Sequence, residues 1–440
     1  MKLVALYKTF DGGEFVDASL SSIYNHVDQI VMVHSDISWL GERGNTVRPL
    51  ALEWCSENDK KGKVRHLDCE LKTQEEQYTL GLGYIAKNKI QFDAIMAVDA
   101  DEVWEGRDIE NAKKQIHDKP FASYRSNMHT YLKTPFFRVD PPYGSPTVFF
   151  REPRYLAKSP RGCHAPAKQL ADVWMHHYTY VRETREDVER KLKQSCLADG
   201  GEEIVTDWMT TVYDKMPEGN NLHAFKRWTR VWSSIKKIWK PDMPEAMRNA
   251  RLLKNWLPEG QLLDGEQNAI HRLASGMKQA VDLGTYKGLS ACVLALACRK
   301  AHTIDCYDSL GDSFADTIDP DRYQKMQDHS LEDTRALSAR YGNMTCEKNN
   351  TWIAADDWSE RSYSPVDFLF VDADHSEIST RWNVACWLKN MRPGSRIVLH
   401  DNNDIHPGVQ VVVREMESSK TYKKLDTGDF SGSLAAFEVV

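Results

Sequence analysis

Short apolar runs alternate with longer amphipathic stretches through the first hundred residues of the chain. Helical spacing of apolar side chains predicts helices over residues 14–24 and 74–89. The apolar runs are bounded by turn or polar residues and predict buried strands at residues 2–7, 28–34 and 64–67 and from residue 94 onward. Strands that alternate with helices in this way predict an α/β fold with a mostly parallel sheet.

The strand predicted from residue 94 ends in acidic residues, Asp99-Ala100-Asp101-Glu102, with Trp104 just behind them. Ligands of open α/β sheets bind outside the carboxyl ends of the strands. Two carboxylates one residue apart at such an end can hold a divalent cation that in turn holds a diphosphate, and oxygen ligands suit Mg²⁺ or Mn²⁺. The alternative is a solvated acidic turn, because Asp-x-Asp on its own is common.

A similar arrangement is predicted in the second half of the chain. A short strand ends at Asp282, a glycine turn runs from Gly284 to Gly288, and an apolar helix follows. Glycines let the backbone approach a ligand closely, and the N-terminus of the helix faces that ligand. The GxxxG spacing fits an adenosylmethionine loop better than a dinucleotide loop. The next predicted strand ends at Asp308, which can hold both ribose hydroxyls, and Asp305 is the alternative.

Length, charge and cysteine content restrict the class of protein. The 440 residues suggest two or three domains, and a formal net charge of −7 argues against a nucleic-acid partner. The nine cysteines are scattered and form no CxxC pair, so we expect reduced thiols in the cytoplasm rather than disulfides or a zinc site. The sequence shows no signal peptide and no apolar run long enough to span a bilayer, so any membrane contact is expected to be peripheral.

A tryptophan-rich stretch at residues 222–240 is predicted to be a helix with one aromatic face. Lys and Arg make the other face, and the aromatic face consists of Trp228, Trp232, Ile235 and Trp239. Trp at helical spacing favours packing against the first domain over contact with a membrane or a lipid-linked acceptor. We therefore predict a first domain at residues 1–220, a helical connector at residues 221–250 and a second domain at residues 251–440.

The first half resembles the GT-A family of nucleotide-sugar glycosyltransferases, particularly its family-2-like members. The resemblance rests on the opening strand and helix, on Ser35-Asp36 after the second strand, and on the acidic motif after the fourth. It implies that Asp36 lies near the base or ribose of the nucleotide and that Asp99 reaches the ribose or the metal. It also implies that Asp101 binds the Mn²⁺ or Mg²⁺ that bridges the diphosphate and acts as a Lewis acid on the leaving nucleotide.

A late strand in the first half adds to this resemblance. Members of the family often place a histidine there to complete the metal shell, and the strand predicted over residues 173–182 carries His176 and His177 on opposite faces. His177 is the predicted ligand, and the alternative is that both are ordinary packing or surface histidines. The acceptor is expected near residues 121–170, and the catalytic carboxylate remains open between Asp140, Glu152 and Asp172.

The second half resembles class I methyltransferases, in particular metal-dependent O-methyltransferases of the catechol, caffeoyl-CoA and macrolide-sugar types. The resemblance rests on the glycine turn and on two further predicted strands, of which the second follows Pro393-Gly394-Ser395. These strands are followed by Asp372, Asp374 and His375 and by Asp401-Asn402. The resemblance implies that S-adenosylmethionine binds at Asp282, Gly284, Gly288 and Asp308, and that Mg²⁺ binds at Asp372, Asp401 and Asn402.

The resemblance also implies how the acceptor is activated. In this family the metal binds the acceptor's hydroxyls and lowers the pKa of one, and a base lies two or three residues past the first aspartate. The catechol type has a lysine there and the sugar-methylating type has an aspartate, whereas this chain has Asp374 and then His375. The catalytic base is therefore open between these two. Residues 310–341 take the place of a helix that covers the substrate in this family. The alternative for the acidic residues that follow the predicted strands is that they only form structural turns.

Together the two resemblances predict a bifunctional enzyme, similar to glycan-building proteins of large algal viruses (chlorovirus-like) and of bacterial surface-polysaccharide clusters. It would transfer a sugar, such as the deoxyhexose rhamnose, from a UDP-linked donor to a glycan and O-methylate a sugar hydroxyl, in the cytoplasm of the cell or of a viral host. The alternative is a sugar O-methyltransferase with a non-catalytic glycan- or nucleotide-binding first domain. A nucleotidylyltransferase fits less well because residues 8–14 lack a basic glycine-rich loop, and a scaffold would bind no adenosylmethionine.

Overall fold

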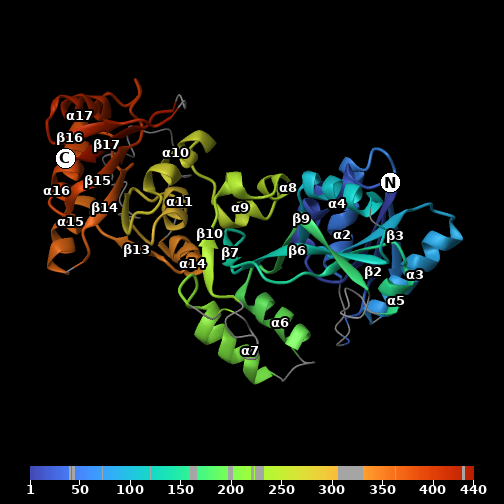
Figure 1. The fold of residues 1–440 in the computed structure, drawn as a ribbon. Helices are drawn as coiled ribbons and strands as arrows, with labels where there is room; N and C mark the ends of the chain where they lie inside the picture. Colours follow the sequence, from blue (N-terminus) through green and yellow to red (C-terminus); the bar gives the residue numbers. More distant parts are fainter. Residues whose placement is uncertain are drawn as a thin grey trace. The chain divides into compact units, whose positions relative to one another are not determined.

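The chain folds into two compact units, Met1–Trp256 and Leu257–Val440 (Figure 1). The structure, a computed structural model, describes all residues except 39–40, 42–44, 72, 119, 159–165, 197–201, 220–221, 223–231, 306–330, 362 and 429–431. The division after Trp256 lies slightly beyond residue 251, where the second domain is predicted to begin. Within the described ranges, no helix combines the length and apolar character that crossing a bilayer requires.

Four parallel strands form the centre of the first unit, in the order β4-β1-β2-β3. They are β1 Leu3–Thr9, β2 Gln29–Ser35, β3 Val64–Cys69 and β4 Ala94–Val98. Nearly every side chain of β1, β2 and β4 is buried, because helices cover both faces of the sheet. The predicted α/β class is therefore confirmed.

Alternate side chains of β1 face two separate cores. One core packs against the helices α1 Val16–Tyr24, α2 Val47–Asn58 and α4 Gly106–Asp118. The other core packs against α3 Gln74–Lys87 and the short α5 Arg154–Lys158. The helix α2 is absent from the sequence predictions, and a 3₁₀ turn at Gly13–Phe15 precedes α1.

The sheet of the first unit continues beyond β4 with antiparallel strands. The strand β8 Thr147–Phe150 pairs with β4 and leads through β6 Ser123–Leu132 to β7 Phe137–Asp140. The long strand β9 Ala167–Tyr180 pairs in parallel with β6 and antiparallel with the short β5 Glu102–Trp104. The pairing of β5 with β9 sets Glu102 opposite His177 and so brings β9 to the acidic motif that follows β4.

The prediction of a helix over residues 222–240 is wrong for residues 234–237. The segment Ser234–Lys237 forms strand β10, which pairs antiparallel with β7 at the edge of the sheet. Pairing with β7 satisfies the backbone groups of this stretch, so tertiary context overrides the helical spacing. Trp232 and Trp239 are buried, which confirms packing for these two residues, whereas Trp228 lies outside the described residues.

A helical layer and three short helical turns complete the first unit. The layer packs on side chains of β6 and β7 in a core of its own. It consists of α6 Arg185–Cys196, α7 Glu202–Trp208 and a π-helical turn at Met209–Tyr213. The short turns are the 3₁₀ turn Lys240–Asp242, α8 Glu245–Arg248 and α9 Leu253–Trp256.

In the described residues, the second unit forms a seven-stranded sheet in the order β13-β12-β11-β14-β15-β17-β16. The parallel strands are β11 Gln279–Leu283, β12 Lys300–Asp305, β13 Met344–Lys348, β14 Val366–Val371 and β15 Met391–Leu399. The strand β17 Ala435–Val439 runs antiparallel to β15 and to β16 Tyr422–Leu425. The strand order reverses between β11 and β14, and ligands of such sheets bind outside the carboxyl ends of strands at this point.

Six helices accompany this sheet in the described residues. They are α10 Asp264–Ala274, α11 Leu289–Ala297, α14 Leu331–Tyr341, α15 Thr351–Glu360, α16 Glu377–Leu388 and α17 Pro407–Ser418. The helices α15, α16 and α17 contribute side chains to the main core of the unit. The turn that leads from β11 to α11 begins at Gly284, with φ of +92°. A Cβ at Gly284 would overlap the backbone carbonyl of Asp372, so the turns after β11 and β14 meet backbone to backbone.

We expect Gly284→Ala to destabilise the second unit more than Gly276→Ala. Gly276 is a matched control, because its φ is +82° and nothing lies within 4 Å of the position of a Cβ. Both substitutions force alanine into the left-handed region, at about 1–2 kcal/mol. Only Gly284→Ala also displaces the turn of Asp372, at about 1–3 kcal/mol more. Urea unfolding measures the difference, and equal losses in both variants would contradict the backbone contact.

Candidate functional site

A carboxylate holds the turn between β11 and α11 against the end of β12. The backbone N–H groups of Thr285 and Tyr286 donate to Asp305 Oδ2 at 2.8 and 3.1 Å. The described part of strand β12 ends at Asp305, and both the last residues of the predicted strand and Asp308 lie outside the described residues. Asp305, the alternative to Asp308, lies at the glycine turn. Gly288, with φ of +88°, ends this turn before α11.

Asp282 is fully buried near the end of β11, beside the same turn. Its Oδ2 accepts hydrogen bonds from the hydroxyls of Thr303 and Ser290 at 2.7 and 3.1 Å. Its Oδ1 is buried without a hydrogen-bond partner among the described residues. Burial raises the pKa of Asp282 to about 7, and the charges of Asp372 and Asp305 act in the same direction. The orphaned oxygen and the two turn glycines fit a ligand that approaches this turn closely.

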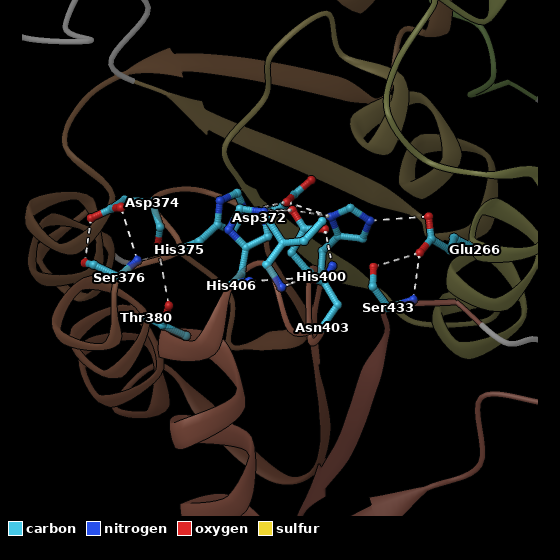
Figure 2. Close-up of polar contacts among 12 residues, drawn as sticks. Glu266, Asp372, Asp374, His375, Ser376, Thr380, His400, Asn403, His406 and Ser433 are labelled. Carbon is cyan, nitrogen blue, oxygen red and sulfur yellow. Dashed lines mark hydrogen bonds and ion pairs between the residues drawn. The ribbon is translucent and has the colours of Figure 1, made fainter. Parts of the chain in front are cut away.

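Five residues form a group at the carboxyl ends of β14 and β15, here called the carboxylate–imidazole cluster (Figure 2). They are Asp372, His375, His400, Asp401 and His406. His375 Nε2 lies 3.3 Å from Asp372 Oδ1 and 3.2 Å from Asp401 Oδ2. His406 Nε2 lies 3.5 Å from the same Asp401 oxygen.

Two overlapping sets within the cluster have ligand atoms within 4.8 Å of one another. One set is His375, Asp401 and His406, and the other is Asp372, His400 and Asp401. Both combine carboxylate and imidazole donors, which are metal ligands in proteins. The cluster therefore fits a bound cation, with the two predicted ligands Asp372 and Asp401 placed together.

His400 is a buried cation within the cluster. Its Nδ1 donates to Asp372 Oδ1 at 2.9 Å, and its Nε2 donates to Glu266 Oε2 at 3.3 Å. Burial alone would lower the pKa of His400, but the hydrogen bonds to Asp372 and Glu266 raise it to about 10. Burial would likewise raise the pKa of Asp372, but hydrogen bonds from His375 and His400 hold it below its ordinary value. Asp372 is therefore ionised at neutral pH.

Asp401 adopts a backbone conformation that is rare outside glycine, with φ of +56°. Asn403 Nδ2 donates to Asp401 Oδ1 at 3.2 Å. Asn403 Oδ1 accepts the backbone N–H groups of Ile405 and His406 at 3.0 and 3.2 Å. Asn403 thereby folds the loop so that Asp401 and His406 lie together, with Asp401 Oδ2 near the imidazoles. Such backbone conformations are concentrated at functional sites.

The two candidate bases lie in different surroundings. The carboxylate of Asp374 accepts the backbone N–H and the hydroxyl of Ser376 at 3.1 and 2.7 Å, and it points away from the cluster (Figure 2). His375 lies inside the cluster. The third predicted metal ligand, Asn402, donates its backbone N–H to the carbonyl of Ser433 at 2.8 Å. The amide bonded to the Asp401 carboxylate belongs to Asn403 instead.

Several residues of this site are missing from the sequence predictions. His400, Asn403 and His406 lie within a few residues of Asp401, and an Asn side chain that bonds backbone two residues on is a recognisable turn signal. Glu266 lies 134 positions before His400 and comes from α10. Its Oε1 accepts the backbone N–H and the hydroxyl of Ser433, both at 3.0 Å. Only the folded sheet reveals this partner.

Asp101 is the centre of a second charged group, in the turn between β4 and β5 of the first unit. It is buried, and its Oδ2 accepts a hydrogen bond from Arg182 Nη2 at 2.9 Å. Its Oδ1 lies 3.6 Å from Nε2 of His177, the predicted partner. Burial alone would raise the pKa of Asp101, but His177 and Arg182 hold it far below its ordinary value. His176 is hydrogen-bonded instead to the hydroxyl of Tyr131, at 2.8 Å.

Basic side chains accompany the acidic motif of the first unit. Lys8 Nζ pairs with Asp99 Oδ1 at 2.7 Å, at the ends of β1 and β4. Lys191, on α6, adds to the lowering of the pKa of Asp101. The predicted nucleotide ligand Asp36 is exposed and follows β2 directly. The structure thus places Asp36 at the carboxyl end of β2 and Asp99 and Asp101 at that of β4, and these two parallel strands flank β1.

Fold and sequence together define the class of the second unit. Its strands follow the order 3-2-1-4-5-7-6 in the unit's own numbering, with the seventh antiparallel, and the order reverses between the first and fourth strands as in Rossmann-like sheets. Residues 281–402 match the family described as a methyltransferase domain. The second unit is therefore an S-adenosylmethionine-dependent methyltransferase domain with a Rossmann-like α/β fold. A comparison with curated protein sequences gives no match.

Solved methyltransferase structures are similar to the chain at low identity. An O-methyltransferase from Bacillus cereus, solved with SAH, is 16% identical over 41% of this chain and 84% of its own, with a TM-score of 0.29. CalS11, a calicheamicin methyltransferase, is 13% identical over 45% and 88%, with a TM-score of 0.34. Its apo form, described as a TDP-rhamnose 3′-O-methyltransferase, is 12% identical over 45% and 87%, with a TM-score of 0.31. Because these scores are low, the class assignment rests on the family match.

The raised pKa of Asp282 predicts how the stability of the second unit depends on pH. The folded-state pKa of about 7 exceeds the ordinary value of 3.8, so the stabilisation is complete below about pH 4 and is lost as pH rises through 7. We expect Asp282→Asn to remove this loss, which is on the order of a few kcal/mol. Urea unfolding of both proteins at pH 4.5 and pH 8, with hydrogen exchange read from α11, measures it. The same pH dependence in both proteins would contradict a protonated Asp282.

Proposed function

We propose that the methyltransferase domain O-methylates a sugar hydroxyl with the help of a divalent cation. The observation that carries this proposal is the carboxylate–imidazole cluster at the ends of β14 and β15. The position of the cluster supports the proposal, because Gly284, in the turn between β11 and α11, meets the backbone of Asp372 directly. This turn is where S-adenosylmethionine is expected to bind. A hydroxyl bound at the cluster would therefore lie next to the methyl donor. Vicinal hydroxyls, which are abundant in sugars, suit a cation with more than one open position.

The transfer requires a new bond between the hydroxyl oxygen and the methyl carbon. The bond from that carbon to sulfur breaks, the sulfur leaves as a neutral thioether, and the hydroxyl gives up its proton. A bound cation would supply Lewis acidity and lower the pKa of the coordinated hydroxyl. His400 keeps Asp372 ionised and therefore ready to face a cation. His375 would act in one of two roles, as a ligand or as the base that takes the proton.

We propose in addition that the first unit transfers a sugar from a UDP-linked donor to a glycan. Support comes from the pair of Asp101 and His177, whose facing atoms lie 3.6 Å apart on an ionised carboxylate and a partly exposed imidazole. Such a pair can share a cation that bridges a diphosphate. Basic groups on β1 and α6 would stabilise the charge that develops on the leaving nucleotide. The alternative remains a first unit that binds the nucleotide-sugar or glycan without catalysis.

Joining both activities in one chain has a physical consequence. A tether converts the encounter between the first product and the second site into an intramolecular event, with a high effective concentration. This consequence favours a shared glycan as the object of both reactions. It also supports the sugar, rather than another hydroxyl compound, as the methyl acceptor.

We expect Asp401→Asn to lower methyl transfer by about 100-fold or more, because it removes a charged ligand of the proposed cation. Asparagine tolerates the positive φ of this position, so the loop is expected to keep its shape. Release of SAH in the presence of a panel of nucleotide-sugars and methyl glycosides is the measurement. The matched control is Asp404→Asn, an exposed carboxylate on the same loop that accepts from Gln410. Full activity in Asp401→Asn would rule out a cation at this residue.

We expect His177→Gln to reduce Mn²⁺-dependent release of UDP from its sugar donor at least tenfold and to leave methyl transfer unchanged. This change spares the buried pair of Asp101 and Arg182, whose disruption would endanger folding. The control is His117→Gln, an exposed histidine in the last turn of α4. Nucleotide binding without release of UDP, for every donor and in the presence of glycan acceptors, would favour the non-catalytic alternative.

A further inference from the structure

The imidazoles of the cluster indicate which metal the methyl transfer would use, an inference that rests on the proposed function. We propose that the cation is a transition ion of the Zn²⁺ type, held by His375 Nε2, His406 Nε2 and Asp401 Oδ2. This set differs from the all-oxygen set of Asp372, Asp401 and Asn402 that the family resemblance implies. Imidazole favours Zn²⁺, Fe²⁺, Ni²⁺ and Cu²⁺, whereas Mg²⁺ prefers oxygen ligands.

The distances from Asp401 Oδ2 to the two imidazole nitrogens suit a shared ion. Two ligands that lie about 2.0–2.1 Å from a Zn²⁺ ion, at tetrahedral angles, are about 3.3–3.4 Å apart. The separations from Asp401 Oδ2 are 3.2 Å to His375 Nε2 and 3.5 Å to His406 Nε2. Both imidazoles thus direct the same type of nitrogen toward a single carboxylate oxygen. Their ring centroids are 4.3 Å apart with the planes tilted by 45°, so the two rings pack against each other beside Asp401.

The competing set of Asp372, His400 and Asp401 is not available to a metal. A metal ligand needs a free lone pair on an imidazole nitrogen. Both ring nitrogens of His400 face carboxylates, Asp372 on one side and Glu266 on the other. His400 is also almost completely buried, at 5% exposure of its side chain, so it cannot turn outward to another partner. His375 Nε2 also lies 3.3 Å from Asp372 Oδ1, but its side chain is 29% exposed, so it can give up this contact for a metal. His375 and His406 are therefore the imidazoles of the cluster that a metal can reach.

The surroundings of Asp401 support a ligand role. Asn403 occupies Oδ1 of Asp401, which leaves Oδ2 directed toward the imidazoles. The same Asn403 fixes the backbone of His406, so one side chain positions two of the three ligands. Hydrogen bonds of this kind orient metal ligands and affect metal affinity strongly. Three protein ligands also leave an open position, as in catalytic zinc sites, which the acceptor hydroxyl would occupy.

This assignment decides the role of His375. As a ligand, His375 is not the base that removes the hydroxyl proton. A Zn²⁺-bound oxygen is acidic near neutral pH, with a pKa of about 7 for bound water in a protein, so the proton can pass to solvent without a dedicated base. The exposed position of Asp374, bonded to Ser376, agrees with a site that needs no carboxylate base.

The test is direct metal binding by the full chain after treatment with a chelator. Titrations with Zn²⁺, Mg²⁺ and Co²⁺ would be followed by calorimetry, and the visible absorption of Co²⁺ would report nitrogen ligation. We expect Zn²⁺ and Co²⁺ to bind at least 100-fold more tightly than Mg²⁺. His406→Ala and His375→Ala should each weaken Zn²⁺ at least tenfold, whereas Asn402→Ala should bind like the native protein. The control His26→Ala removes an imidazole paired with Glu110 in the first unit and should have no effect.

Calorimetry of S-adenosylmethionine binding by each variant shows whether the domain remains folded. Equal affinity for Mg²⁺ and Zn²⁺, or loss of binding in Asn402→Ala but not in His406→Ala, would overturn the inference in favour of the oxygen set. Absence of any bound ion would overturn it as well. Sugar methylation in the presence of chelator would then support the proposed methyl transfer but refute the role of a cation in it. Tight Zn²⁺ binding that depends on both histidines, without methylation of any sugar, would support the metal site and refute the proposed acceptor.

Discussion

Each unit depends on a buried cation that holds a carboxylate at the end of a strand. Arg182 donates to Asp101 in the first unit, and His400 lies between Asp372 and Glu266 in the second. A carboxylate that is buried without such a partner takes up a proton or turns toward solvent. The two cations therefore keep Asp101 and Asp372 charged at the edge of the sheet where ligands bind. Removing one partner of such a pair costs about 3–5 kcal/mol, which ties the geometry of each site to the stability of its unit.

In each site, one carboxylate has one oxygen held by a protein side chain and the other oxygen directed toward imidazole. In the first unit, Arg182 occupies Asp101 Oδ2, and Oδ1 faces the partly exposed His177. In the second unit, Asn403 occupies Asp401 Oδ1, and Oδ2 faces two imidazoles. One oxygen of each carboxylate is thus fixed by the protein, while the other remains near a nitrogen donor. The two sites therefore share one arrangement, in which one carboxylate oxygen makes a structural contact and the other can bind a ligand.

The sequence predicts the fold well where both faces of the sheet are covered. Strands in such a sheet, for example β1, β4 and β14, are continuous apolar runs that are easy to recognise. The prediction fails at Ser234–Lys237, where strand pairing with β7 overrides helical spacing. At the sites, the sequence indicates which strand ends carry carboxylates, but side-chain direction depends on neighbours. Ser376 at the start of α16 draws Asp374 away from the cluster, and Glu266 enters from a distant helix. Such contacts arise only when the sheet has formed.

The two proposed cation sites have different protein ligands. This difference matches what the two proposed reactions require of the metal. A diphosphate brings several oxygens of its own, so one carboxylate and one imidazole suffice beside it, and Mg²⁺ or Mn²⁺ suits that shell. A hydroxyl brings one or two weak oxygens, and it must become acidic before it can attack a methyl group. Two imidazoles and one carboxylate keep an ion at low coordination number, where it acidifies a bound oxygen most strongly. A chain built in this way would lose methyl transfer when Zn²⁺ is scarce, whereas sugar transfer would continue with Mg²⁺ or Mn²⁺.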